Sequence, residues 1–319
     1  MKVFITGGAG NIGQYVTLAA AKKEHDVVVL SRTPEKYSGL AKMNPRIKIV
    51  QGFINEYDKI AEYVEDCDAV IHIALGWGNE PVTMCMEDTV PTINLMEISE
   101  KAGVERFIYT SSTAVLGHYE SDMEESLAVS PTGLYGSTKA AAEAYILGFR
   151  EYGAESGTIG EEVTMLRNII RPGYTFSNPP YEGGSSQLDR RFRDITDAIV
   201  KGYPIQLVKN DGTQFLSAEQ IAEVYIAILE NGDMTGEIFF ALGNTYITWE
   251  RIAQIALEEH PKSNSTIELY DKGYGETPMM FSVKKMKDVL GLEFSGEDAV
   301  REHIKWNLEQ SLKKMNTSS

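Results

Sequence analysis

A glycine-rich turn near the start of the chain constrains the fold more than any other feature. Val3 to Thr6 form a short apolar run, the residues from Gly7 to Gly13 follow with the sequence GGAGNIG, and Ile12 to Lys23 continue in a helical pattern. The spacing fits both G-x-G-x-x-G and G-x-x-G-x-x-G. Glycines here allow a tight strand-to-helix turn and let the backbone approach a pyrophosphate, which the N–H groups and positive dipole of the helix N-terminus hold. The turn therefore predicts a dinucleotide-binding unit, and a purely structural turn is the alternative.

The first half of the chain continues this alternation of strand and helix. Short apolar runs predict strands at 26–30, 47–50, 69–74 and 106–110, and helical patterns lie near 56–64 and 82–102. Such strands, bounded by turn residues and separated by helices, are typical of a parallel sheet covered on both faces. The predicted fold class is α/β, a doubly wound parallel sheet of the Rossmann type, with ligands at the carboxyl ends of the strands.

The alternation is lost after about residue 172. Asn178 to Gly184 are loop-forming residues, helical patterns recur near 188–201, 218–230, 248–259 and 297–314, and strands are expected near 205–208 and 237–241. We expect a dinucleotide-binding Rossmann domain over residues 1–172, to which segments near 215–243 return. Residues 173–319 would then form a smaller, mixed α/β lobe that binds the substrate.

The charge of the chain limits its partners. Its 319 residues include 30 Lys+Arg and 46 Asp+Glu, a formal net charge of −16, which disfavours nucleic acid and anionic membrane surfaces. No stretch approaches the ~20 apolar residues of a membrane span. Two cysteines and five histidines show no ligand spacing, so neither a disulfide framework nor a metal site is predicted. Because the first strand begins at once, leaving no room for a signal peptide, we expect a cytoplasmic protein that acts on a small molecule.

The end of the second predicted strand indicates which dinucleotide binds. An acidic residue here would accept hydrogen bonds from a ribose 2′-hydroxyl, but the chain has Ser31-Arg32 instead. A hydroxyl and a guanidinium suit a 2′-phosphate, since Arg binds phosphate in bidentate fashion. The sequence therefore favours NADP(H) over NAD(H), unless Arg32 is simply a solvated surface residue.

Three residues further along form a candidate catalytic set. Ser112 follows the strand at 106–110, and Tyr135 and Lys139 lie four residues apart at the start of a predicted helix, hence on one face. A phenol with a pKa near ~10 transfers protons poorly at neutral pH, and a neighbouring ammonium is expected to lower that pKa. Such a Y-x-x-x-K pair alone is usually an exposed pair without function. Together with the serine and the glycine turn, it predicts hydride exchange between a nicotinamide and an alcohol or carbonyl.

The sequence resembles the extended short-chain dehydrogenases/reductases, of the NAD(P)-dependent epimerase/dehydratase type. The resemblance covers nearly the whole chain. It rests on segments spread along the sequence, namely Thr6–Gly13, Asp68–Ala74, Asn94–Glu97, Ala102–Val104, the serine strand with Tyr135 and Lys139, Arg171–Gly173, Phe281–Lys285 and Leu290–Gly291.

The resemblance implies roles for individual residues. Ser112 would polarise the substrate, Tyr135 would act as acid and base, and Lys139 would lower the tyrosine pKa and bind the nicotinamide ribose. Further cofactor contacts would come from Gly7, Gly10, Asn11 and Ile12 at the pyrophosphate, Phe53 and Ile54 at the adenine, Ile73, Ala74 and Leu75 beside the cofactor, and Pro172 near the nicotinamide. Phe53 replaces an acidic residue of the family, so one adenine hydrogen bond would be missing. His72 is expected to be structural, and family members often form homodimers.

Departures from the family narrow the chemistry. Sugar-nucleotide 4,6-dehydratases carry Asp-Glu directly after the catalytic hydroxyl, where this chain has Thr113 and Ala114. The segment 211–217 lacks the arginine that holds a sugar nucleotide's diphosphate. Arg190, Arg191 or Arg193 could substitute, although a solvated basic helix face is the simpler interpretation. Apolar substrate walls could come from Trp77, Tyr174, Phe176 and Met279 to Phe281, although core packing is the commoner role for such residues.

Three functions stay open at this point. The first is an NADP(H)-dependent oxidoreductase that interconverts a secondary alcohol and a carbonyl. The second is a nucleotide-sugar epimerase with tightly bound NAD, and the third is a non-catalytic NADP-sensing protein. The complete set of Ser112, Tyr135 and Lys139 argues against a sensor. The sequence favours the oxidoreductase and does not name its substrate.

Overall fold

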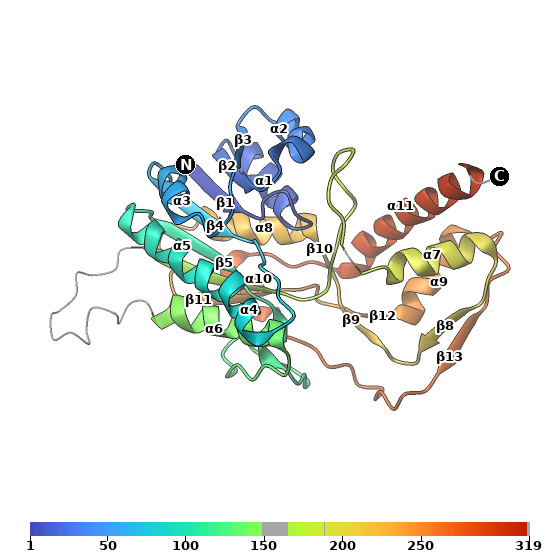
Figure 1. The fold of residues 1–319 in the computed structure, drawn as a ribbon. Coiled ribbons are helices and arrows are strands. Elements are labelled where there is room, and N and C mark those ends of the chain that lie inside the picture. The colour runs from blue at the N-terminus through green and yellow to red at the C-terminus, as the bar shows by residue number, and fades with distance from the viewer. Residues whose placement is uncertain (149–164, 188, 318–319) are drawn as a thin grey trace.

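A seven-stranded parallel sheet forms the main body of the protein. The computed structural model describes residues 1–148, 165–187 and 189–317, and its sheet has the strand order β11-β6-β5-β4-β1-β2-β3 (Figure 1). The strands are β1 (Lys2–Thr6), β2 (Asp26–Ser31), β3 (Ile47–Gln51), β4 (Ala69–His72), β5 (Arg106–Thr110), β6 (Leu166–Pro172) and β11 (Glu237–Ala241). All pairings between them are parallel. The predicted doubly wound α/β fold is confirmed.

Helices cover both faces of this sheet, as the alternation of side chains along its strands requires. Val3 and Ile5 of β1 pack in one apolar core and Phe4 in the other. The first core lies under α1 (Gly13–Lys22), α2 (Ser38–Met43) and α8 (Ala218–Leu229). The second lies under α3 (Tyr57–Val64), α5 (Val90–Lys101) and α6 (Leu134–Gly148). Both faces of the sheet are therefore covered by helices, and a ligand can reach it only at its edges.

The helix expected over 82–102 is interrupted. The structure has a short α4 (Pro81–Met84), a π-helical turn η2 (Cys85–Thr89) and then α5. Pro91 explains the interruption, because it has no N–H to donate to the carbonyl of Glu87 four residues earlier. The widened turn places Asp88 at the carboxyl edge of the sheet, where π turns are often functional.

The second half of the chain builds a separate layer of helices. α7 (Arg191–Lys201), α9 (Trp249–Glu259) and α11 (Gly296–Thr317) enclose an aromatic core. The first residues of the helix expected over 188–201 include residue 188, which lies outside the described residues, and α7 begins at Arg191. Three small strand pairs complete this part: β8 (Ile205–Val208) with β13 (Ile267–Tyr270), β9 (Gly212–Gln214) with β12 (Tyr246–Thr248), and β7 (Thr175–Phe176) with β10 (Leu216–Ser217).

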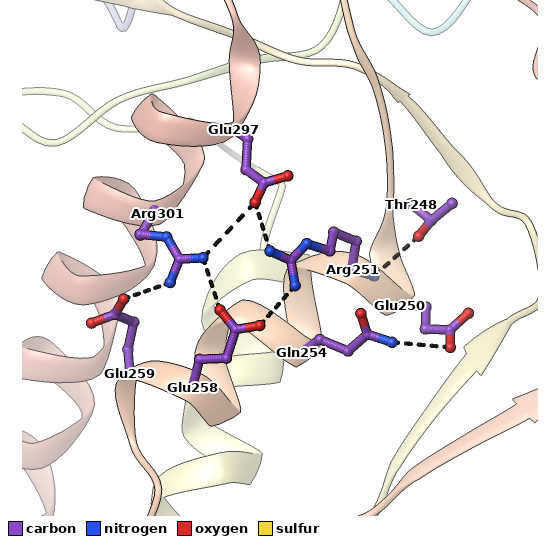
Figure 2. A network of polar contacts seen from close by, with 8 residues as sticks. All are labelled: Thr248, Glu250, Arg251, Gln254, Glu258, Glu259, Glu297 and Arg301. Carbon is purple, nitrogen blue, oxygen red and sulfur yellow. Dashed lines mark hydrogen bonds and ion pairs between the residues drawn. The ribbon is translucent and has the colours of Figure 1, made fainter.

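An ion-pair network fastens α9 to α11 (Figure 2). Arg251 of α9 binds Glu258 at 2.7 Å and Glu297 of α11 at 2.6 Å. Arg301 of α11 binds Glu259 at 2.6 Å and Glu258 at 2.8 Å. Because these side chains are partly exposed, each pair contributes little to stability, but a shared network fixes the crossing of the two helices.

The chain returns to the sheet body after leaving it. α8 packs beside α1, and β11 adds an edge strand next to β6. α10 (Lys284–Leu290) contacts both β11 and α8, a return that the sequence did not predict. Two short 3₁₀ turns, η1 (Pro34–Tyr37) and η3 (Thr113–Leu116), lie after β2 and β5. Within the described ranges, no helix has the length and apolarity needed to cross a membrane.

Candidate active site

The glycine turn after β1 cannot accept larger residues at two positions. Gly7 has φ +67°, and a Cβ there would lie 2.6 Å from the backbone nitrogen of Ala74. A Cβ on Gly13 would lie 2.0 Å from the carbonyl oxygen of Gly7, so α1 would have to move away from β1. Gly10 is different, because a Cβ there would meet only the Gly7 oxygen, at 3.2 Å. Its missing side chain leaves backbone open on the side where a ligand would approach.

The N-terminus of α1 is suited to an anion. No side chain caps the helix, and its first turn has no acidic residue. Within the described part of the chain, the backbone N–H groups of Asn11, Ile12 and Gly13 find no hydrogen-bond acceptor. Free N–H groups at a helix start together with an open glycine backbone fit the pyrophosphate of a dinucleotide.

A cavity of about 460 Å³ opens beside this turn at the carboxyl edge of the sheet. It brings together eight of the residues predicted to bind cofactor: Gly7, Gly10, Ser31, Arg32, Phe53, Ile54, Ala74 and Leu75. Six others do not line it, and two of these, Tyr135 and Lys139, are described below. Asn11 bonds to the Ser177 hydroxyl, Ile12 and Ile73 pack against the core under α1, and Pro172 is buried at the end of β6.

The cavity is also lined by the residues expected to contact the adenine and its ribose. Ser31 is buried and Arg32 is exposed, and no carboxylate among the described residues pairs with the guanidinium. Phe53 is 52% exposed, so its ring is available to a planar base. Tyr37 and Asn55 also line the cavity, and neither was predicted. Asn55 offers an amide where the family's acidic residue is missing, but it belongs to no recognisable motif.

The predicted catalytic residues meet next to this cavity. Ser112 lies two residues after the end of β5, and its hydroxyl is close enough to the Tyr135 phenol on α6 to lower the pKa of that phenol. Tyr135 in turn lies beside Trp77, with ring centroids 6.4 Å apart. Trp77 lines the cavity and is 64% exposed, so it is not part of the core. The Tyr135 phenol thus has Ser112 on one side and Trp77, which lines the cavity, as another neighbour.

Lys139 lies one helical turn after Tyr135 and is almost fully buried. Its ammonium nitrogen is 3.4 Å from Oδ2 of Asp88, whose side chain is also buried, and 5.1 Å from the centre of the Tyr109 ring. Burial lowers the pKa of Lys139, and the Asp88 carboxylate counteracts this effect. Asp88 lines the cavity and was not predicted, because no sequence spacing connects it to Tyr135 or Lys139.

The pKa of Tyr135 does not show the lowering that we expected from Lys139. The pKa of Tyr135 is raised above 10.0, chiefly by burial and further by the Asp88 charge, although the Ser112 hydroxyl opposes the shift. The buried carboxylate compensates the ammonium charge. Tyr135 is therefore a neutral phenol at physiological pH.

His72, at the end of β4, is structural, as expected. Its Nδ1 bonds to the Thr6 hydroxyl at 2.5 Å and its Nε2 to the Thr92 hydroxyl at 2.8 Å. Burial, together with the Lys139 charge, lowers its pKa to about 3, so the ring is neutral. Since both nitrogens are occupied, His72 fixes β4 between β1 and α5.

Arg191 of the arginine cluster is exposed, as a solvated face requires, but its guanidinium also makes specific contacts. Its guanidinium lies 4.2 Å from the centre of the Trp249 ring and donates two hydrogen bonds to Asp189, at 2.9 and 2.7 Å. Tyr174 and Phe176 belong to the same aromatic core and form no wall of the cofactor cavity. Met279 instead lines a second cavity of about 430 Å³, beside Asp211 and Tyr246.

Comparison with known proteins decides the family. The model of the NAD dependent epimerase/dehydratase family matches residues 3–241. The chain belongs to this family. This confirms the resemblance to extended short-chain dehydrogenases/reductases.

Individual relatives of this family member differ in their reactions. A 3 beta-hydroxysteroid dehydrogenase/Delta 5-->4-isomerase of Mycobacterium tuberculosis is 29% identical over 220 residues, 65% of this chain and 54% of that protein. A dTDP-D-glucose 4,6-dehydratase of Mus musculus is 29% identical over 281 residues, 84% of this chain and 75% of that protein. The chain thus spans about half the length of the first relative.

Solved structures of similar fold include epimerases. The UDP-glucuronic acid 4-epimerase of Bacillus cereus, in complex with NAD, has a TM-score of 0.76 with 18% identity, covering 98% of this chain and 96% of that one. At this identity the likeness bears on the fold alone.

Proposed function

We propose that this family member is an NADP(H)-dependent oxidoreductase that interconverts a carbonyl and a secondary alcohol on a small molecule. The observation that carries the proposal is the meeting of Ser112, Tyr135 and Lys139 beside the glycine-turn cavity. We also propose that residues 1–172, with segments near 215–243, hold the cofactor and that the remainder of 173–319 shapes the substrate site.

The described residues fit a dinucleotide along the whole cavity. Gly7, Gly10 and the start of α1 would hold the pyrophosphate, Phe53 and Ile54 would contact the adenine, and Ala74 and Leu75 would lie along the dinucleotide. When bound, the nicotinamide supplies or accepts a hydride. Ser112 would orient the substrate oxygen, and Tyr135 would give that oxygen a proton or remove one. Lys139 would bind ribose hydroxyls through its ammonium group.

The preference for NADP(H) rests on Arg32. Its guanidinium is exposed at the cavity and has no carboxylate partner within the described residues. No acidic side chain lies at the end of β2 to bind a 2′-hydroxyl, and Ser31 adds a hydroxyl donor. Both features support a 2′-phosphate.

Neither dehydration nor epimerisation of a sugar nucleotide is favoured. Thr113 and Ala114 follow Ser112, so no carboxyl group lies there to move the protons of an elimination. Arg191 could hold a diphosphate, but Asp189 already occupies its Nε and Nη2 groups.

Cofactor extraction and turnover test the proposal. Purified protein should release no stoichiometric NAD, should bind NADPH reversibly, and should oxidise NADPH with members of a panel of ketones, steroids and nucleotide sugars. Stoichiometric NAD that survives gel filtration, together with epimerisation of a nucleotide sugar, would support the epimerase and contradict our proposal.

A further inference from the structure

Among the described residues, one of the two fully buried ion pairs includes Lys139, one helical turn from the catalytic tyrosine. Within the described residues, only Lys139–Asp88 and Arg171–Glu143 have both side chains 3% exposed or less. The second pair joins β6 to α6 through two short hydrogen bonds, of 2.9 and 2.7 Å, and holds the fold together. The first pair lines the cofactor cavity through Asp88. A buried pair costs desolvation, so one that lies in an active site suggests a role beyond stability.

The surroundings of Asp88 fix its carboxylate against Lys139. Oδ1 accepts a hydrogen bond from the backbone N–H of Gly76 at 3.0 Å, and Oδ2 faces the ammonium at 3.4 Å. The Asp88 carbonyl accepts a 2.7 Å bond from the Thr92 hydroxyl, which locks the π turn. A Cβ on Gly76 would lie 1.8 Å from the Glu87 carbonyl oxygen, so the cavity loop is packed tightly on this turn. The carboxylate has little freedom to move away from Lys139.

We infer that Asp88 is a positioning residue that acts through Lys139: its carboxylate holds and compensates the ammonium, so that Tyr135 keeps its proton and the site favours reduction of a carbonyl. This inference rests on the proposed function. An uncompensated ammonium one turn from the phenol would favour the phenolate, the form that accepts a proton from an alcohol. The Asp88 charge removes that bias.

Several titratable groups face this pair from neighbouring elements. Tyr135 is influenced by Asp88 on the π turn and by Tyr119, and it is close enough to influence Tyr109 of β5 and Tyr225 of α8. Lys139 is influenced by Glu143 on its own helix, and it acts in turn on His72 of β4. Burial keeps Tyr109, Tyr135, Tyr225 and His72 neutral at physiological pH. Glu143 is already paired with Arg171. Asp88 is therefore the charge that can balance Lys139.

In the reductive step, the proton comes from Tyr135, which the Asp88–Lys139 pair keeps protonated. The carbonyl carbon gains a hydride from NADPH, which is thereby oxidised to NADP⁺, and the carbonyl oxygen gains the phenolic proton of Tyr135. The tyrosinate that is left then recovers a proton from water. In the opposite direction Tyr135 must first lose its proton, which the Asp88 charge opposes.

A titration of the cofactor-free protein tests the inference without any turnover. The near-ultraviolet absorbance of tyrosinate is followed against pH in the native protein and in Tyr135→Phe, and the difference isolates Tyr135. We expect Tyr135 to ionise above its ordinary pKa of 10.0. Ionisation near neutral pH would overturn the inference. Because no Asp88 variant is needed, the result does not depend on whether such a variant folds.

Asp88→Asn tests the same inference through the pH profile of kcat/KM for carbonyl reduction. Removing the negative charge should move the alkaline loss of activity toward lower pH by at least about one unit. Asp88→Glu, which restores the charge, should return the profile toward that of the native protein. The matched control is Asp68→Asn at the amino end of β4, where the carboxylate binds the Lys2 backbone N–H at 2.6 Å, and its profile should not move.

The outcomes separate the two proposals. A lower kcat in Asp88→Asn with an unmoved alkaline limb would mean that Asp88 is merely structural, and would overturn the inference. A native protein that never oxidises NADPH would contradict the proposed function, while the tyrosinate titration would still show whether Tyr135 keeps its proton.

Discussion

His303 makes the stability of the protein sensitive to mild acid. This residue of α11 is 2% exposed, and its Nδ1 lies 2.6 Å from the Asn178 side-chain oxygen. Its Nε2 lies 3.0 Å from each of two amide nitrogens, those of Gln187 and Asn307. An oxygen partner requires a proton on Nδ1, and two N–H donors require a lone pair on Nε2. The neutral ring fits this site, and a protonated ring would direct an N–H at two donors.

The pKa of His303 gives the size of the effect. Burial, together with the Arg193 charge, lowers it to about 3 from 6.5 in the unfolded chain. The resulting stability is fully present above pH 6.5 and is lost as the pH falls from 6.5 toward 3, because the unfolded chain then binds a proton that the folded one does not. Each pH unit in this window costs about 1.4 kcal/mol, so the loss at about pH 5 is roughly 2 kcal/mol.

Urea unfolding of the native protein and of His303→Gln, each at about pH 7 and about pH 5, measures the contribution of His303 to the loss of stability in acid. The acid-induced loss of unfolding free energy should be smaller in the variant by roughly 2 kcal/mol. Other titrating groups, including His72 with its pKa of about 3, are present in both proteins and cancel in the difference. Equal losses in the two proteins would show that His303 titrates normally when folded, and would refute the reasoning.

Three further changes probe the cavity. Gly13→Ala should abolish NADPH binding and lower the melting temperature, because the new methyl would meet the Gly7 carbonyl oxygen at 2.0 Å; Gly133→Ala, where a Cβ meets nothing within 4 Å, is the control, and equal effects would contradict the steric argument. Arg32→Ala should weaken NADPH binding about 10- to 150-fold and leave NADH binding unchanged, as titration of cofactor fluorescence would measure; unchanged selectivity would disprove the 2′-phosphate contact. Trp77→Ala should raise the KM of the carbonyl substrate more than it lowers the melting temperature, because the side chain is 64% exposed; a large loss of stability with an unchanged KM would mean that Trp77 serves packing.

Most of the sheet body was predictable because its signals are local. Short apolar strands such as Asp26–Ser31 are buried along almost their whole length, so their hydrophobic runs identify them without knowledge of their neighbours. The predicted strand at 69–74 is two residues longer than β4. Its last residues still bond to Thr6, but the chain there leaves the sheet to pass over Gly7. Such a departure depends on the partner strand rather than on the sequence of the strand itself.

The site residues were predictable only where they belong to a local sequence motif. The glycine turn and the Tyr135–Lys139 spacing are local patterns, and the structure brings them to one cavity edge. Asp88 comes from a π turn caused by Pro91, and its pairing with Lys139 spans 51 positions of the sequence. The raised pKa of Tyr135 follows from burial and, to a smaller extent, from the Asp88 charge, so no inspection of the helix alone could have predicted it.

Arg191 shows the same limit in the second half of the chain. In the sequence it belongs to a basic cluster that resembles a solvated helix face. In the structure it stacks on Trp249, which lies 58 positions away, and pairs with Asp189. Contacts between distant elements decide which charges of such a cluster are free.

The most direct test of the central claim measures carbonyl-dependent oxidation of NADPH by the native protein and by Tyr135→Phe, with cofactor binding measured on both. The account predicts that both bind NADPH equally well. Turnover by Tyr135→Phe should be lower by about 10²- to 10⁴-fold, the usual contribution of general acid–base catalysis. A variant that binds NADPH and turns over at a rate close to that of the native protein would contradict the account.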